Sequence, residues 1–147
     1  MGWRQGRLVK TLATKALAGG ALVLIMALAT AQARPAGAIF QISTDSETTW
    51  KVAVRNARNL QAAMRPKPIR IEIIVFGPGL KMLLKGSPVA PNLMMLHKGG
   101  VVIEARKDGL KKLGITPDQV LPIVHYIRSG IAELVERERQ GWAYIRP

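Results

Sequence analysis

Short apolar runs alternate with stretches of helical periodicity along most of this sequence. The run at residues 73–76 is apolar at every position, which is typical of a strand in a parallel sheet that helices cover on both faces. Strands are expected at residues 38–44, 69–77, 101–105, 123–129 and 142–147. The pattern therefore predicts a mostly parallel sheet of about five strands.

Helical periodicity fills the intervals between the predicted strands. From Trp50 to Met64 apolar residues recur three and four positions apart, and Thr44 and Glu47 are spaced as a capping box in front of them. Shorter helices are expected within residues 77–86, 87–100 and 107–114, and an amphipathic helix over residues 130–141. Strand–helix alternation with short turns predicts one open α/β domain with helices on both faces of the sheet.

The first 38 residues have a different character. Residues 1–15 carry four basic side chains and no acidic one, residues 16–33 are uncharged, and small-x-small sites end at Ala33 and Ala38. This order is typical of a signal peptide, although 18 uncharged positions also lie at the lower limit for an uncleaved membrane anchor. In both cases the basic end stays cytoplasmic, so residues 39–147 are expected to be exported to the periplasm.

Composition narrows the possible partners of the domain at residues 39–147. Removing residues 1–38 takes away 5 basic and no acidic residues, which leaves 17 basic against 9 acidic and a net charge of +8. Such a charge favours acidic partners or anionic envelope surfaces. Nucleic acid is not expected, because aromatic residues make up only 5% of the chain and no nucleic-acid-binding motif is present.

Two predicted loops follow buried strands and could receive an anion. Gly77, Pro78 and Gly79 follow the second strand, and Arg106 and Lys107 follow the third. Ligands of open α/β sheets favour the carboxyl ends of strands, where glycines expose backbone N–H groups and a guanidinium can grip an oxyanion with two hydrogen bonds. The alternative is a tight strand-to-helix turn beside a solvated arginine.

No catalytic or metal-binding constellation is expected from the remaining residues. The chain has no cysteine, which excludes disulfides and thiol nucleophiles. His97 and His125 lie 28 positions apart without carboxylates that the sequence can place beside them, so no metal site and no cofactor are expected. Glu72 and Glu104 lie in predicted strands, and their spacing indicates no acid–base chemistry.

Four stretches, in this order, resemble the DsrE/DsrF-like family of small α/β proteins associated with sulfur relay. They are NARNL, EIIVFGPGLKMLL, KKLGITPDQVLPIV and SGIAELVERERQGWAYIRP, which begin at residues 56, 72, 111 and 129. The resemblance implies a three-layer, flavodoxin-like fold over residues 39–147. It also implies a homo-oligomer, often a trimer or hexamer. Trp142, Tyr144 and Ile145 form a short aromatic strand, which is expected partly buried at a subunit contact, with ordinary core positions as the alternative.

The resemblance places an arginine where sulfur-handling members of the family carry a persulfide cysteine. That cysteine follows the third core strand, where this chain has RKDG beginning at Arg106. Arginine has no sulfur, so the resemblance implies the fold of the family without its sulfur-carrier activity.

The sequence thus predicts an exported, non-catalytic homo-oligomer that binds a partner or a small anion at this corner. Two alternatives stay open: an accessory protein of periplasmic sulfur metabolism that acts on a sulfur oxyanion, and a basic protein that binds envelope surfaces. The candidate binding residues are Arg106, Lys107, Gly77, Pro78, Gly79, Lys81 and Asn56.

Overall fold

The computed structural model of the chain describes residues 36–147, so most of the predicted leader lies outside the described residues. Within residues 36–147, no helix has the length and apolar character needed to cross a membrane. Five strands form a single sheet in the order β4–β3–β2–β1–β5, and every strand pair is parallel. The strands are β1 (Gly37–Ile42), β2 (Arg70–Val75), β3 (Val102–Arg106), β4 (Val124–Ile127) and β5 (Ala143–Ile145).

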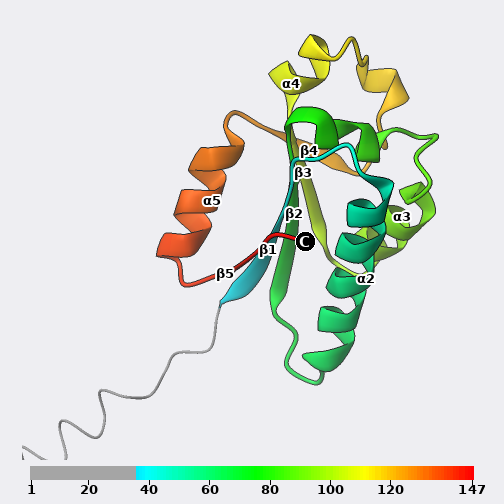
Figure 1. Cartoon of the computed structure of the whole chain (residues 1–147). Coiled ribbons are helices and arrows are strands. Elements are labelled where there is room, and N and C mark those ends of the chain that lie inside the picture. The colour runs from blue at the N-terminus through cyan, green and yellow to red at the C-terminus, as the bar shows by residue number, and fades with distance from the viewer. Residues whose placement is uncertain (1–35) are drawn as a thin grey trace, which may run out of the picture. The chain divides into compact units, whose positions relative to one another are not determined.

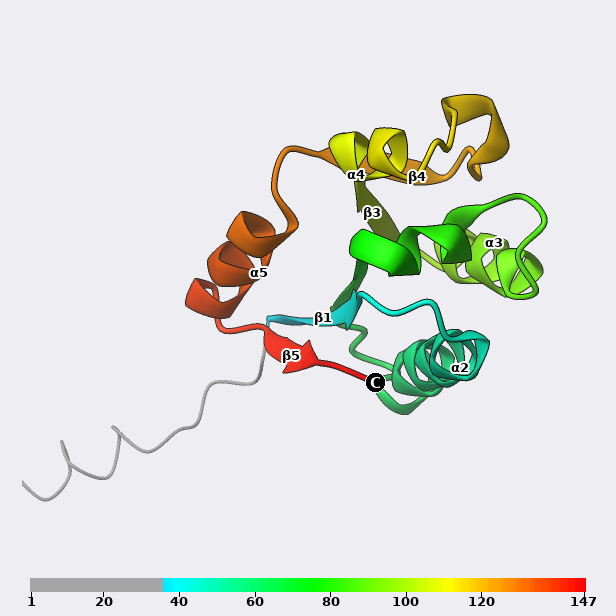
Figure 2. The ribbon, with the colours of Figure 1, turned by 45° about the horizontal axis from the view of Figure 1, so that its top comes forward.

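Helices lie on both sides of this sheet, which confirms the predicted three-layer, flavodoxin-like α/β fold (Figure 1). Helix α5 lies alone on one side, while α2 and α3 lie on the other, and a second view keeps this separation (Figure 2). The helical elements are α2 (Glu47–Ala63), η1 (Gly77–Leu83), α3 (Ala90–Lys98), α4 (Lys107–Lys112), η2 (Pro117–Gln119) and α5 (Gly130–Arg139).

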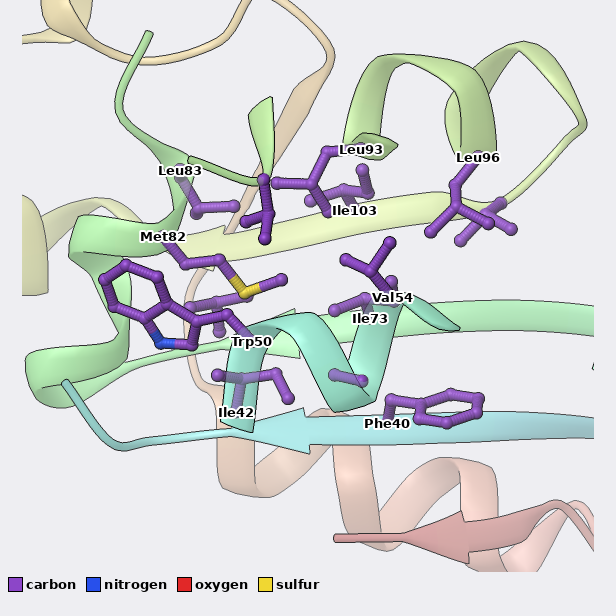
Figure 3. Close-up of a cluster of buried hydrophobic side chains, with 14 of the residues drawn as sticks. Phe40, Ile42, Trp50, Val54, Ile73, Met82, Leu83, Leu93, Leu96 and Ile103 are labelled. Carbon is purple, nitrogen blue, oxygen red and sulfur yellow. The ribbon is translucent and has the colours of Figure 1, made fainter. Parts of the chain in front are cut away.

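The first face of the sheet, which α2, η1, α3 and α4 cover, carries the main hydrophobic core. Alternate residues of β1 and β2, such as Phe40, Ile42 and Ile73, point into it and are fully buried (Figure 3). Burial of side chains of this size contributes about 1.5–3 kcal/mol each. The second face has a much smaller apolar cluster under α5, which consists of Ile39, Ile74, Leu134 and Trp142.

The start of α2 differs from the sequence prediction. Ser46 is the N-cap, and its side chain accepts a hydrogen bond from the Thr49 backbone N–H at 3.3 Å. The predicted capping box of Thr44 and Glu47 is wrong, because Glu47 is the first residue of the helix and cannot reach back from the third helical position. Thr44 instead offers its backbone oxygen to the Trp50 indole N–H at 2.9 Å.

The folded sheet begins before the predicted domain boundary at residue 39. Gly37 pairs with Arg70 on β2, and Ala38 pairs with Ile71 on β2 and Ala143 on β5. Residues 37 and 38 therefore belong to β1, an inner strand between β2 and β5, rather than to a segment that precedes the sheet.

Candidate functional site

The two predicted loops lie at the same edge of the sheet. Strands β2 and β3 are parallel neighbours, with Val75 opposite Ala105, so the residues after each strand emerge side by side. Helix α4 then packs on η1 so closely that a Cβ added at Gly109 would lie 2.7 Å from the Leu80 side chain. The structure thus brings Arg106 and the turn at Gly77 into adjacent loops.

The glycines of the turn after β2 are explained by packing. Gly77 has a φ of +57°, a left-handed conformation that favours glycine. Gly79 is buried, and a Cβ at this position would lie 2.9 Å from the backbone oxygen of Ile42. Pro78 occupies the first turn of η1, where its missing N–H costs nothing. This turn therefore needs no ligand to account for its sequence.

The basic side chains at this edge differ in how strongly they are already paired with a carboxylate. The Arg106 side chain is 49% exposed, and its Nη2 lies 3.7 Å from Asp108 Oδ2, a long surface pair that contributes little. Lys81 is held more tightly, because its Nζ lies 2.5 Å from Asp45 Oδ2. Arg106 is therefore the more available cation of the two.

A hollow of about 380 Å³ lies along α4, directly after Arg106. Its lining includes two basic residues one helical turn apart, one acidic residue and several apolar ones: Lys107, Lys111, Asp108, Leu110, Ile115 and Pro117. Lys111 was absent from the residues predicted by sequence, although its spacing from Lys107 on a basic helix was visible there. Two ammonium groups beside apolar walls suit an anion that carries an apolar part.

Asn56 does not join the other predicted residues. It is an exposed residue in α2, nine positions after Glu47. At about 1.5 Å of rise per residue this places Asn56 about 14 Å along the helix axis from its first residue. The structure therefore gathers Arg106, Lys107 and the turn after β2 at one edge of the sheet, while Asn56 lies on a different element, well along α2.

A second polar group, which the sequence did not predict, lies on the second face of the sheet. Oxygen atoms of Glu72 on β2, Glu104 on β3 and Glu133 on α5 lie within 4.8 Å of one another. Arg137 on α5 donates from Nε to Glu72 at 2.6 Å, and its Nη2 lies 2.7 Å from Glu133. We call these three glutamates the carboxylate cluster.

Glu104 is the unusual member of the carboxylate cluster. It is only 8% exposed and forms no hydrogen bond with the described residues, and its Oε2 is completely covered. Burial, followed by the charges of Glu72 and Glu133, raises its pKa from 4.5 to about 7, although Arg137 acts in the opposite direction. Hydrogen bonding to Glu72 in turn raises the pKa of Arg137.

Trp142 packs next to this cluster and inside its own chain. The guanidinium carbons of Arg70 and Arg137 lie 4.8 and 4.9 Å from the centre of its ring. Trp142 is 5% exposed in the single chain, so the core alternative accounts for its burial without a second subunit, while the expected subunit contact stays a prediction. Tyr144, on the edge strand β5, stays exposed.

Comparison with known proteins identifies relatives among solved structures. No protein-family model and no curated protein matches the chain. A protein of unknown function from Methanobacterium thermoautotrophicum, MTH1491, is 32% identical with a TM-score of 0.69, over 75% of this chain and 97% of that one. This chain belongs to the same family as MTH1491. BT1422, a conserved protein of unknown function from Bacteroides thetaiotaomicron, has a TM-score of 0.60 at 20% identity, over 76% of this chain and 95% of that one.

Membership of the MTH1491 family establishes the fold, and the similarity to BT1422 adds only that the fold is shared. The chemistry of this member must therefore be inferred from its own side chains. The edge at Arg106 offers cations beside an apolar hollow, and the carboxylate cluster offers oxygen ligands in a largely buried setting. These two places therefore present opposite charges.

Proposed function

We propose that this protein is an exported, non-catalytic, DsrE-like binding protein. Its binding site is the corner formed by Arg106, Lys107 and Lys111, and its ligand is a small anion or the acidic group of a partner protein. The hollow along α4 is the observation that carries this proposal, because two lysines line it directly after a half-exposed arginine. A guanidinium and two ammonium groups recognise carboxylates, phosphates and sulfur oxyanions.

Binding is favoured over sulfur transfer by the chemistry of the corner. Arg106 ends β3, where the resemblance to the DsrE/DsrF-like family expects a persulfide cysteine, and the chain contains no cysteine elsewhere. A persulfide requires a thiolate sulfur, which none of these side chains supplies. An accessory role in periplasmic sulfur metabolism would therefore act on a sulfur oxyanion that the protein binds without covalent attachment.

Self-association is part of the proposal. Ile131 and Val135 lie one turn apart on the outer side of α5 and are 61% and 43% exposed, and Tyr144 is exposed on the edge strand β5. Large exposed apolar side chains next to a sheet edge favour pairing with another chain. Native mass spectrometry of the full chain should give a trimer or hexamer, and a monomer at micromolar concentration would contradict this part.

Export is proposed from the leader, and the strand pairing of β1 favours one cleavage position. Cleavage after Ala33 would leave β1 complete. Cleavage after Ala38 would remove Gly37, which pairs with β2, and Ala38, which pairs with both β2 and β5. N-terminal sequencing of the protein recovered from the periplasm distinguishes the two positions, and an uncleaved chain in the membrane fraction would show that the leader is an anchor.

Anion binding can be tested by thermal unfolding of the full chain with phosphate, sulfate, thiosulfate or succinate. We expect at least one anion to raise the Tm of the wild type by a few degrees, because a ligand that binds only the folded state stabilises it. The rise should disappear in Arg106→Ala and persist in Arg139→Ala, which removes an exposed cation from α5. If no anion changes the wild-type Tm, the pocket proposal fails.

Two further measurements separate the alternatives. Intact mass after treatment with a persulfide donor should show no added sulfur in the wild type, whereas Arg106→Cys should gain sulfur; a stable adduct on the wild type would overturn the non-carrier assignment. Sedimentation with anionic lipid vesicles tests the envelope-binding alternative. Binding to vesicles that Arg106→Ala leaves unchanged would favour the general basic charge over the corner.

A further inference from the structure

The carboxylate cluster has more negative charge than its surroundings compensate. Glu72, Glu104 and Glu133 face one guanidinium, that of Arg137, so the ionised group keeps two negative charges. Arg137 is already engaged by Glu72 and Glu133. Its ion pairs leave Glu104 without a direct partner.

Glu104 is the observation that points to a missing ligand. More than nine-tenths of this residue is buried, and it forms no hydrogen bond with the described residues. Its Oε2 is covered, and its side chain reaches into the carboxylate cluster. Buried polar atoms normally have a partner, and a buried carboxylate is costly unless it is paired or binds a metal. A positively charged ligand would give Oε2 of Glu104 a partner. It would also neutralise the remaining negative charge of the carboxylate cluster.

We propose that Glu72, Glu104 and Glu133 bind a divalent cation of the Ca²⁺ type, which fastens α5 to the second face of the sheet. Carboxylate oxygens are the preferred ligands of Ca²⁺, Mg²⁺ and Mn²⁺. Because one glutamate comes from β2, one from β3 and one from α5, a single ion joins three elements. A divalent charge also matches the two negative charges that Arg137 leaves uncompensated.

The geometry that each ion requires favours Ca²⁺ over Mg²⁺. Ca²⁺ binds oxygen at about 2.3–2.6 Å, so two ligands on opposite sides of the ion lie about 5 Å apart. The corresponding separation for Mg²⁺ is about 4 Å, in a strict octahedron. The three oxygens lie within 4.8 Å of one another on three separate elements, which suits the larger and more flexible Ca²⁺ shell better than the strict octahedron of Mg²⁺. Water can complete the coordination from the side of Glu133, which is partly exposed.

Terbium luminescence provides a direct test with the full chain. Tb³⁺ replaces Ca²⁺ in oxygen sites and is excited by a nearby indole, and Trp142 stacks on the arginine that pairs with the cluster. We expect a saturable Trp-sensitised signal that Ca²⁺ displaces at least tenfold more effectively than Mg²⁺. Ca²⁺ should also raise the Tm of the wild type relative to the protein in chelator.

Matched glutamine variants locate the site. Glu104→Gln and Glu133→Gln should each weaken the apparent affinity for Tb³⁺ at least tenfold, while Glu138→Gln, an exposed position of α5, should leave it unchanged. Circular dichroism checks that each variant is folded. A folded wild type without a saturable signal would overturn the proposal and show that the cluster holds only a proton. Equal affinity in Glu104→Gln would also overturn it, since the ion would then bind elsewhere.

Discussion

The two faces of the sheet use different physical means to hold their helices. The first face packs α2, η1, α3 and α4 against a large aliphatic core (Figure 3). The second face holds only α5, through four buried apolar residues and the ion pairs of Arg137. Among the described residues, no buried side-chain polar atom on the first face lacks a hydrogen-bond partner. The second face buries the carboxylates of Glu72 and Glu104 beside its small core.

This difference separates the apolar core of the first face, which stabilises the fold, from the charged groups of the second face, which carry candidate chemistry. Apolar packing is non-directional and roughly proportional to the buried area, so the first face stabilises the sheet whatever the protein binds. Charged groups on the second face contribute only when their partners are correctly placed. Most of the apolar core and the carboxylate cluster therefore lie on opposite sides of the same strands.

The strongest test of the comparison uses neighbouring residues of β1 that point to opposite faces. Phe40 and Ile39 are both fully buried, the first under α2 and the second under α5. Phe40→Ala should lower the free energy of unfolding by about 4 kcal/mol, because it leaves a cavity in the large core. Ile39→Ala should cost less, about 2–3 kcal/mol, because the small cluster can relax into the space.

Urea unfolding followed by circular dichroism measures both values. An equal or larger loss for Ile39→Ala would mean that the second face is packed as rigidly as the first.

The sequence predicted the first face far better than the second. Apolar runs such as residues 73–76 and the helical period from Trp50 to Met64 depend on local pattern, and they led to the correct α/β fold. Arg106 was correctly placed at the end of a strand, because strand ends are local features. The polar group on the second face was missed, because it depends on the pairing of β2 with β3 and on the docking of α5.

Two local details, the cap of α2 and the position of Asn56, were also beyond what the sequence pattern could predict. Ser46 rather than Thr44 caps α2, because capping depends on where the backbone turns and not only on residue spacing. Asn56 was grouped with Arg106 through resemblance alone, and the two residues lie on different elements, α2 and the end of β3. Glutamates at inward-facing positions of two predicted strands were the one available sign of the carboxylate cluster, since buried glutamates are rare unless paired.

The next largest effect is expected from removing Arg137, the guanidinium that pairs with the carboxylate cluster. Arg137→Met keeps much of the side-chain volume but leaves Glu72 buried without its ion pair. We expect a loss of about 3 kcal/mol of unfolding free energy, since an uncompensated buried charge is expensive. Arg139→Met, an exposed change two residues away, should stay within about 0.5 kcal/mol.

A double variant shows whether this loss is electrostatic. Adding Glu72→Gln to Arg137→Met removes the uncompensated charge, so much of the lost stability should return. Additive losses in the double variant would indicate that Arg137 acts mainly by packing against Trp142.

The smallest of the three effects concerns the pH dependence that Glu104 gives to the second face. Its pKa is about 7 in the folded chain and near 4.5 when unfolded, so the folded state binds more protons between these values. Stability should therefore fall as pH rises through this window. Below about pH 4.5 the Glu104 carboxyl is protonated and its burial costs no charge penalty. Above about pH 7 the full free-energy cost of burying the ionised carboxylate is present. In chelator, the change from pH 5 to pH 7.5 should be about 2 kcal/mol.

Glu104→Gln should remove this slope and make the protein more stable than the wild type at pH 7.5, because the neutral amide needs no proton to be buried. Glu138→Gln should keep the wild-type slope, since it changes the charge of α5 without touching the cluster. Urea midpoints across the pH range measure the effect. If Glu104→Gln retained the slope, the pH sensitivity would arise outside the second face, and the contrast between an apolar face and a titrating face would fail.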